Sequence, residues 1–423
     1  MSKSVFKRKN KLKMDAIGKT IVSINAINIG STGNIMYLIS SLAETNGFKT
    51  VQMYPLNIGV KNSRFLNDYI IEGKICHRIV EIAEKITGLH NCFNIYHTLK
   101  LIHKISKLNP AIIQLHNIHG SYINLYILFK YIKKNKIKVV WTLHDCWAFT
   151  GRCPHFSLIN CAKWKTVCKK CKYPSNFYPC SFFDTSSYLF DIKKAAYEKG
   201  IQMTIVTPSK WLAELVKQSF LSSYKVIIIN NGIDLSVFKP MKSDFRQRYN
   251  CANKIILLGV ASSWDKRKGL DIFVELANKL ESNFQIVLVG VKESLIKTLP
   301  KNIISISRTN TKKTLVEIYS AADIFINPTL EDNYPSVNME ALACGTPVIT
   351  YNTGGSAEII GTNCGYIIYT NTVSELLRII RQNKSIKQTN SNFCVEYAKR
   401  FDQKLCYSKY IQLYFKLIKD GYS

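Results

Sequence analysis

Two acidic residues, Asp332 and Glu340, lie close together in EDNYPSVNMEALACGTPVI at residues 331–349. The run DIFINPT before this segment is typical of a buried strand, so Asp332 belongs to the loop at its carboxyl end. Residues 336–343 can form a helix that contains Glu340 and ends before a glycine. Carboxylates in such places can accept hydrogen bonds from two hydroxyls of a ribose or hexose, and the amides of the helix start can bind phosphate oxygens.

A basic pair, Arg267 and Lys268, follows the predicted strand ILLGVA in SSWDKRKGLD and precedes a predicted helix. Cations at a helix start are unfavourable because the helix dipole prefers anions there. A bound diphosphate would compensate, since arginine offers a planar fork to phosphate oxygens and lysine a point charge. The alternative is a solvated basic loop, which applies more to Lys266 and Arg267 than to Lys268 beside its glycine.

Two further strand ends carry residues that could take part in binding or catalysis. His144 and Asp145 follow a strand in WTLHDCWAFTG, where a histidine facing a ligand could contact a sugar hydroxyl or a developing positive centre. The alternative is a buried histidine satisfied by backbone groups. Gly30 and Gly33 in NIGSTGN allow close backbone approach to a ligand, but the loop is not GxGxxG, so a tight turn without ligand is the alternative.

A cysteine cluster occupies the middle of the chain: Cys153, Cys161, Cys168 and Cys171, in C-x7-C-x6-C-x2-C spacing, with Cys146 and Cys180 flanking them. The closing C-x-x-C with two further thiols is similar to a structural zinc site, although the first two spacings are long. Disulfides and unbonded buried thiols are the alternatives. The lysines around the cluster could face an anionic acceptor or a membrane surface.

The pattern of apolar runs predicts two α/β halves in series, because a chain of 423 residues is too long for one ordinary core. We expect two doubly wound, Rossmann-like domains facing a central cleft, with ligands beyond the carboxyl ends of the strands. The expected parts are an N-terminal acceptor domain at 1–222, with a basic tail at 1–19 and a cysteine-rich insertion at 146–180, a nucleotide-sugar domain at 223–404, and a helix at 405–423 that packs back on the N-terminal domain.

The net charge of +30, from 58 basic and 28 acidic residues, favours polyanions such as phosphorylated ligands, anionic lipid or nucleic acid, unless it reflects compositional bias. The apolar run AIIQLHNIHGSYINLYILF is interrupted by His116, Asn117 and His119, so we expect no membrane span. The start MSKSVFKRKNKLK is basic without an apolar core, which predicts a solvated tail rather than a signal peptide. We therefore expect a cytosolic protein with reduced cysteines.

The segment EDNYPSVNMEALACGTPVI resembles the nucleotide-sugar motif of retaining glycosyltransferases of the GT-B fold, family 4. That family has two acidic residues and then an Ala-Cys-Gly-x-Pro run, although its first acidic residue is commonly Glu, where this chain has Asp332 beside Glu331. NGIDLSVFKP, Lys268-Gly269 and GGSAE are similar to further motifs of the family. At the position where the family usually has an arginine, this chain has Ser263. We infer that Arg267 takes the place of that arginine. TLHDCWAFTGRCPHF looks like a subgroup that builds bacterial capsular, colanic-acid-type or exopolysaccharide chains.

The resemblance implies a role for each candidate residue. Lys268 and Arg267 would neutralise the diphosphate leaving group without a metal ion, in keeping with the absence of any Asp-x-Asp in the chain. Glu340 would hold the ribose, Asp332 the transferred hexose, and His144 would lie near the anomeric centre. The remaining donor-binding residues implied are Gly30, Gly33, Glu331 and Asn333.

The predicted function is transfer of a hexose from a UDP- or GDP-sugar to a lipid-linked or saccharide acceptor. No cofactor is expected for catalysis, a structural zinc ion is the one metal considered, and no specific nucleic acid is expected as partner. An anionic membrane surface is a further expected partner, which would make the protein peripheral on the inner face of the plasma membrane. Two alternatives are a GT-B-fold sugar-nucleotide epimerase and a zinc-containing nucleic-acid-binding protein.

Overall fold

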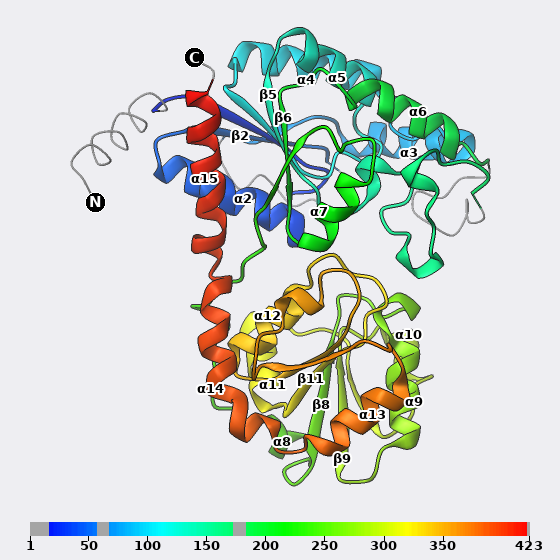
Figure 1. Ribbon diagram of the computed structural model, residues 1–423, viewed down its shortest axis with the longest axis vertical. Helices are drawn as coiled ribbons and strands as arrows, with labels where there is room; N and C mark the ends of the chain where they lie inside the picture. Colours follow the sequence, from blue (N-terminus) through cyan, green and yellow to red (C-terminus); the bar gives the residue numbers. More distant parts are fainter. Residues whose placement is uncertain (1–16, 57–66, 172–182, 421–423) are drawn as a thin grey trace. The chain divides into compact units, whose positions relative to one another are not determined.

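The computed structural model describes residues 17–56, 67–171 and 183–420. Most of the predicted basic tail, and Cys180 at the end of the predicted cysteine-rich insertion, lie outside these residues. The chain divides into two compact units (Figure 1). The first unit comprises Met1–Ile229 and Tyr407–Ser423, and the second comprises Asn230–Cys406.

The first unit is built on a seven-stranded parallel sheet in which the chain order reverses between β1 and β4. Its central strands are buried on both faces, as expected of apolar runs in a parallel sheet covered by helices. In spatial order the strands are β3 (Tyr69–Ile70), β2 (Lys49–Tyr54), β1 (Thr20–Ile24), β4 (Ile112–Leu115), β5 (Lys138–Thr142), β6 (Met203–Thr207) and β7 (Lys225–Ile228).

Helices connect these strands in the alternation that the sequence predicts. Side-chain caps begin two of them: Asn124 accepts from the Ile127 amide, and Ser209 accepts from the Leu212 amide. The helices of the first unit are α2 (Gly30–Thr45), α3 (Lys74–Thr87), α4 (Ile95–Leu108), α5 (Leu125–Lys134), α6 (Ser186–Tyr197), α7 (Lys210–Lys217) and most of α15 (Gln403–Lys419).

The second unit repeats the arrangement with a six-stranded parallel sheet. Its order again reverses once, between β8 and β11, so both units have the strand order of a Rossmann-like fold. In spatial order the strands are β10 (Ile303–Ile306), β9 (Phe284–Val289), β8 (Ile255–Val260), β11 (Ile324–Asn327), β12 (Val348–Tyr351) and β13 (Gly365–Ile368). The helices are α8 (Phe245–Arg248), α9 (Leu270–Lys279), α10 (Glu293–Ile296), α11 (Lys312–Ala321), α12 (Ser336–Ala343), α13 (Val373–Gln382) and α14 (Ile386–Ala398).

The division between the units falls after β7, a few residues beyond the predicted boundary at 222. The reason is that β7 pairs with β6 and so completes the first sheet. The last helix, α15, contributes to the first unit through Tyr414, whose hydroxyl donates to Gln114 Oε1 at 2.9 Å. Within the described residues, no helix combines the length and the apolar character that a membrane crossing needs.

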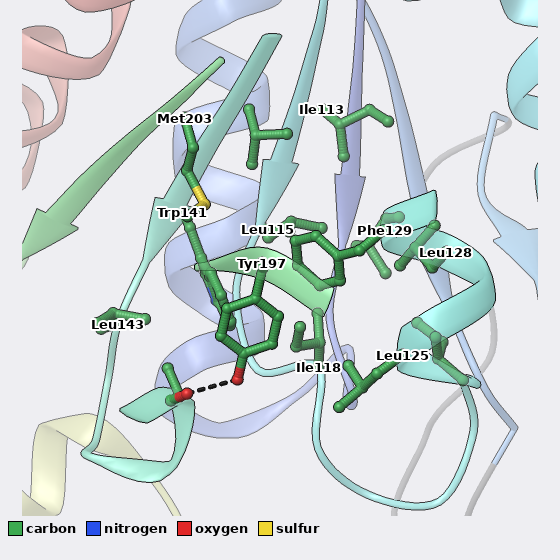
Figure 2. Close-up of a cluster of buried hydrophobic side chains, with 14 of the residues drawn as sticks. Ile113, Leu115, Ile118, Leu125, Leu128, Phe129, Trp141, Leu143, Tyr197 and Met203 are labelled. Atoms are coloured by element: carbon green, nitrogen blue, oxygen red, sulfur yellow. Dashed lines mark hydrogen bonds between the residues drawn. The ribbon is translucent and has the colours of Figure 1, made fainter. Parts of the chain in front are cut away.

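The core of the first unit lies directly under the ends of β4 and β5, and it fixes the loops that follow these strands. Figure 2 shows Trp141, Tyr197 and Phe129 packed together in this core. Trp141 Nε1 donates to the carbonyl oxygen of His116 at 3.0 Å, and Tyr197 donates to that of Ala148 at 2.5 Å, the bond drawn as a dashed line. Aromatic side chains of the core therefore hold the backbone of both loops in place.

Candidate active site

The basic and acidic loops of the second unit meet where the order of its sheet reverses. The basic loop follows β8 and the acidic loop follows β11, and these two strands are neighbours in the sheet. In open α/β sheets ligands bind outside the carboxyl ends of the strands at such a reversal. The topology therefore defines a candidate ligand site before any side chain is considered.

The basic loop forms a single 3-10 turn, η4 (Lys266–Lys268), that docks on the strand end of β11. Asp265 starts the turn by accepting from the Lys268 amide at 2.9 Å. Gly269 has a φ of 78°, and a Cβ there would lie 2.6 Å from the Pro328 carbonyl oxygen, so only glycine permits this close packing. The Leu330 amide donates to the carbonyl oxygen of Arg267 at 2.8 Å, which joins the two loops.

Lys268 and Asp332 form an ion pair across these loops. Their side chains keep 22% and 19% of their surface exposed, so the pair is accessible from solvent. Arg267 lies next to it and donates from Nη1 to the carbonyl oxygen of Glu331 at 3.1 Å. The structure thus brings four predicted residues, Lys268, Arg267, Asp332 and Glu331, together at the neighbouring ends of β8 and β11. Such a group can bind an anion through its cations and hydroxyls through its carboxylates.

The glycines after β12 fix the backbone of Asp332. Gly354 has a φ of 56°, and a Cβ there would lie 1.7 Å from the Asp332 carbonyl oxygen. The Gly355 amide donates to the same oxygen at 3.3 Å. This contact explains why the sequence has a glycine at position 354. A single 3-10 turn, η5 (Ala357–Ile359), follows these glycines, and the chain is extended again at Ile360.

Glu340 lies inside α12, the helix predicted over residues 336–343. Pro335 is the N-cap of this helix. Tyr319 of α11 donates from its hydroxyl to Glu340 Oε2 at 3.1 Å. Burial raises the pKa of the Glu340 carboxyl, and the hydrogen bonds from Tyr319 and Ser336 offset only part of this effect. The carboxylate is therefore held where its charge is poorly solvated, as is common for groups that bind ligands. Asn333, the remaining predicted donor residue, is buried in the loop before α12.

In the first unit, His144 lines a pocket whose empty space, including the part open to solvent, is about 190 Å³. Its ring stacks on that of His116, with Nε2 lying 3.1 Å from His116 Nδ1. His119 and Asp145 line the same pocket and pair at 3.1 Å. His144 is therefore bonded to another side chain, and not satisfied by backbone groups alone as the alternative reading of the sequence expected.

The two pairs differ in charge. Burial lowers the pKa of His144 to about 4, against an opposing effect of Asp145, and burial also lowers the pKa of His116 well below its usual value. The stacked pair is thus neutral near pH 7. Burial alone would raise the pKa of Asp145, but the charge of His119 and its hydrogen bond outweigh this and lower it to about 2. The pocket accordingly presents neutral imidazoles beside a carboxylate.

The glycines of the first loop serve its packing. Gly30 begins α2 with a φ of 69°, and Gly33 lies in its first turn. A Cβ on Gly33 would lie 2.5 Å from the carbonyl carbon of Asn28. Asn25, at the end of β1, accepts from the Asn117 amide at 3.2 Å, which ties this loop to the one after β4. Backbone conformation and packing therefore explain why both positions are glycine. Contact of these glycines with a donor stays a prediction.

Sequence reasoning missed several residues of these sites. His116 and His119 were considered only as interruptions of an apolar run, although their place after a strand was a usable signal. Tyr319 carried no signal, because its role depends on the packing of α11 against α12.

Among the described residues, the four cysteines of the predicted zinc cluster form no disulfide bond, and they lie in a segment whose regular structure is limited to short 3-10 turns. A hydrogen bond with the Cys171 thiol, together with burial and the nearby Cys168 and Cys161, raises the pKa of Cys153. Among the residues that the structure describes, no group of three or more His, Cys, Asp or Glu side chains has an arrangement that could hold a metal ion. Structural zinc therefore stays a prediction.

Two Rossmann-like units in one chain define the GT-B fold, and solved structures share it. The chain is similar to sucrose-phosphate synthase from Thermosynechococcus elongatus, with a TM-score of 0.68 and 14% identity over 95% of this chain and 100% of that one. It is also similar to Anabaena HepE in complex with UDP-glucose, with a TM-score of 0.63 and 12% identity over 93% of this chain and 98% of that one. These likenesses establish the fold.

Sequence comparison adds a match to a family model within the second unit. Residues 241–401 match the family model described as glycosyl transferases group 1. A protein of Escherichia coli K12 named provisionally as the colanic acid biosynthesis glycosyl transferase WcaC is 25% identical over 58% of this chain and 60% of its own length. An N,N'-diacetylbacillosaminyl-diphospho-undecaprenol alpha-1,3-N-acetylgalactosaminyltransferase of Campylobacter jejuni is 25% identical over 54% and 63%. The chain thus spans about 60% of the length of these relatives. Fold and family match together support a GT-B glycosyltransferase.

Proposed function

We propose that this protein is a retaining glycosyltransferase of family 4 that transfers a hexose from a UDP- or GDP-sugar to a lipid-linked or saccharide acceptor, in the synthesis of a bacterial surface polysaccharide. The observation that carries the proposal is the Lys268–Asp332 pair at the reversal of the second sheet. A cation and a carboxylate side by side suit a ligand that joins a diphosphate to a polyhydroxylated sugar.

In this proposal Lys268, with Arg267, neutralises the diphosphate as its bond to the anomeric carbon breaks. Stabilisation of a departing anion by fixed cations is electrostatic work. Asp332 accepts hydrogen bonds from the hexose and Glu340 from the ribose. Glu331 and Asn333 support the donor from the same loop. The roles predicted for His144, Gly30 and Gly33 in the first unit stay predictions.

The names of two relatives support a lipid-linked acceptor. The Campylobacter relative carries an undecaprenol diphosphate acceptor in its name, and so does a UDP-Gal:alpha-D-GlcNAc-diphosphoundecaprenol alpha-1,3-galactosyltransferase of Escherichia coli, which is 26% identical over 39% of this chain and 46% of its own length. The HepE structure contains UDP-glucose. The comparisons favour neither the epimerase nor the nucleic-acid-binding alternative.

A panel of UDP- and GDP-sugars tested by thermal shift identifies the donor, because a ligand that binds the folded state stabilises it by mass action. We expect one nucleotide sugar to raise the Tm of the parent and of Lys266→Met, and to have little effect on Lys268→Met. Lys266 is a matched control because it is an exposed lysine of the same turn.

A second experiment tests the reaction itself. Incubation of the protein with that donor and polyprenyl-diphosphate sugars, followed by NMR of the product, reports whether the anomeric configuration is retained. A free nucleotide sugar that isomerises without any acceptor would contradict the proposal in favour of an epimerase.

A further inference from the structure

Helix α3 is oriented with its apolar side outward. Its buried residue is Glu84, whose carboxylate accepts from the Asn91 amide at 2.7 Å and from the Ser121 hydroxyl at 2.6 Å. A helix that packs on a core normally buries its apolar stripe and exposes its charged residues. In α3 the charged residue anchors the helix to the first unit, so the opposite side of the helix has another purpose.

That opposite side carries a stripe of four isoleucines. At about 100° per residue they fall within a sector of about 60°, roughly opposite Glu84. Their exposed fractions are 78% for Ile75, 62% for Ile79, 50% for Ile82 and 53% for Ile86. A row of large apolar side chains in solvent is unusual for a folded protein and marks a surface that binds a partner.

Helix α4 extends the apolar surface. Asn94, the residue before α4, donates to Glu72 Oε2 at 2.5 Å, and His77 of α3 lies 2.7 Å from Glu72 Oε1. This shared carboxylate brings the first turns of the two helices together, and both helices can be followed in Figure 1. Exposed apolar residues occur in α4 as well. We call the following residues the α3–α4 surface: Ile75, Ile79, Ile82, Ile86, Ile95, Tyr96 and Leu99.

The charges around this surface select its partner. The exposed charged side chains of α3 are the basic Lys74, Arg78 and Lys85 and the acidic Glu81. On α4, the Lys100 ammonium lies 4.5 Å from the centre of the Tyr96 ring. Basic residues beside an apolar stripe are the pattern of helices that lie in the interface of an anionic bilayer. A second copy of this chain, with the same net charge of +30, would place basic residues against basic residues.

We propose that the α3–α4 surface binds an anionic lipid bilayer, with the isoleucines entering the boundary between head groups and acyl chains and Arg78 and Lys85 facing lipid phosphates. The inference does not depend on the proposed function, because it uses no residue of the candidate active site. It assigns membrane binding to a particular surface, in addition to the general attraction that the net charge of the chain provides.

The test is flotation of the full-length protein with vesicles of phosphatidylcholine alone or with phosphatidylglycerol. We expect binding to the anionic vesicles and at least about tenfold weaker binding for Ile79→Ser/Ile82→Ser, because the substitutions remove the apolar area that would be buried. These substitutions leave the net charge unchanged, so the electrostatic attraction of other basic segments of the chain to anionic vesicles is preserved. The matched control is Phe393→Ser, which removes a 55% exposed aromatic side chain of α14 in the second unit and should bind like the parent.

A second variant, Arg78→Gln/Lys85→Gln, removes basic charge without altering the stripe. It should bind anionic vesicles more weakly, and its binding should depend less on salt. Equal binding of the parent and the isoleucine variant would overturn the proposal, as would equal binding of the parent to neutral and anionic vesicles. Dimerisation of the parent that the isoleucine variant abolishes, without vesicle binding, would also overturn it and assign the surface to a second copy.

Discussion

Lys268 and Asp332 form an ion pair although 64 positions separate them in the sequence. Each follows a different strand, and the two strands are neighbours only because the sheet order reverses between them. The pair places a cation and a carboxylate in the one position of the second unit where the fold itself favours a ligand. In the proposed reaction they act on different parts of the donor, so their contributions can be separated by experiment.

Removal of the cation should impair turnover strongly. We expect Lys268→Met to lower kcat/KM about 10²- to 10³-fold, because a fixed charge facing the departing diphosphate is lost. Lys266→Met should retain parental activity. Steady-state kinetics with the donor selected by the thermal-shift panel measure the effect, and equal kinetics for the parent and Lys268→Met would contradict the assignment.

Removal of the carboxylate should separate binding of the nucleotide from binding of the sugar. Asp332→Asn frees the Lys268 ammonium from its partner, so the nucleoside diphosphate alone should bind about two- to fivefold more tightly. The ratio of the affinity for the complete nucleotide sugar to the affinity for the nucleoside diphosphate should fall about tenfold, because a hydrogen-bond acceptor for the hexose is weakened. Isothermal titration with both ligands measures the two effects. An unchanged affinity ratio would show that Asp332 does not contact the sugar.

Much of this site follows from the sequence because its parts are local. The apolar runs predict the strands, and α12 occupies the predicted residues 336–343. The GT-B fold was predicted correctly and rests on the alternation of strands and helices over the whole chain. Local patterns also place Lys268 and Asp332 at strand ends, which is why both were candidates.

The remaining features depend on tertiary packing. Periodicity identifies α3 as amphipathic but cannot show that Glu84 is buried and the isoleucines are exposed. The stacking of His116 on His144 follows from the neighbouring positions of β4 and β5 in the sheet. No spacing rule connects these two histidines, since a complete helical crossover separates their strands.

The raised pKa of Glu340 predicts a pH-dependent stability. A carboxyl whose folded pKa lies above its unfolded value stabilises the protein below the unfolded pKa, and this contribution is lost as the pH rises through the folded value. Glu340→Gln should therefore be more stable than the parent at pH 7, by about 0.5–2 kcal/mol, with a smaller difference at pH 4. Urea denaturation at both pH values measures this difference. A variant less stable than the parent at pH 7 would contradict the interpretation.

The lowered pKa of His144, about 4, has the opposite sign. Between pH 4 and the usual histidine value near 6.5, the unfolded chain binds a proton that the folded state does not, so stability is lost as the pH falls through this window. His144→Asn removes this contribution to the pH dependence, and the decrease in unfolding free energy from pH 7 to pH 4.5 should be smaller than in the parent by about 2 kcal/mol. Parallel urea titrations isolate the effect as a difference between the two proteins. Equal decreases would show that His144 has an ordinary pKa.

The cysteine cluster predicts a metal content that can be measured directly. The segment from Cys153 to Cys171 has only short 3-10 turns, and segments with so little regular structure often depend on a cross-link or a metal ion. We expect about one zinc ion per chain in protein purified without added metal, and a lower Tm after chelation. Cys171→Ser should lose the zinc, whereas Cys76→Ser, which alters an exposed thiol of α3, should retain it. Metal-free parent protein with a cooperative, chelator-insensitive melting transition would exclude a structural zinc ion and leave the four thiols as packing residues.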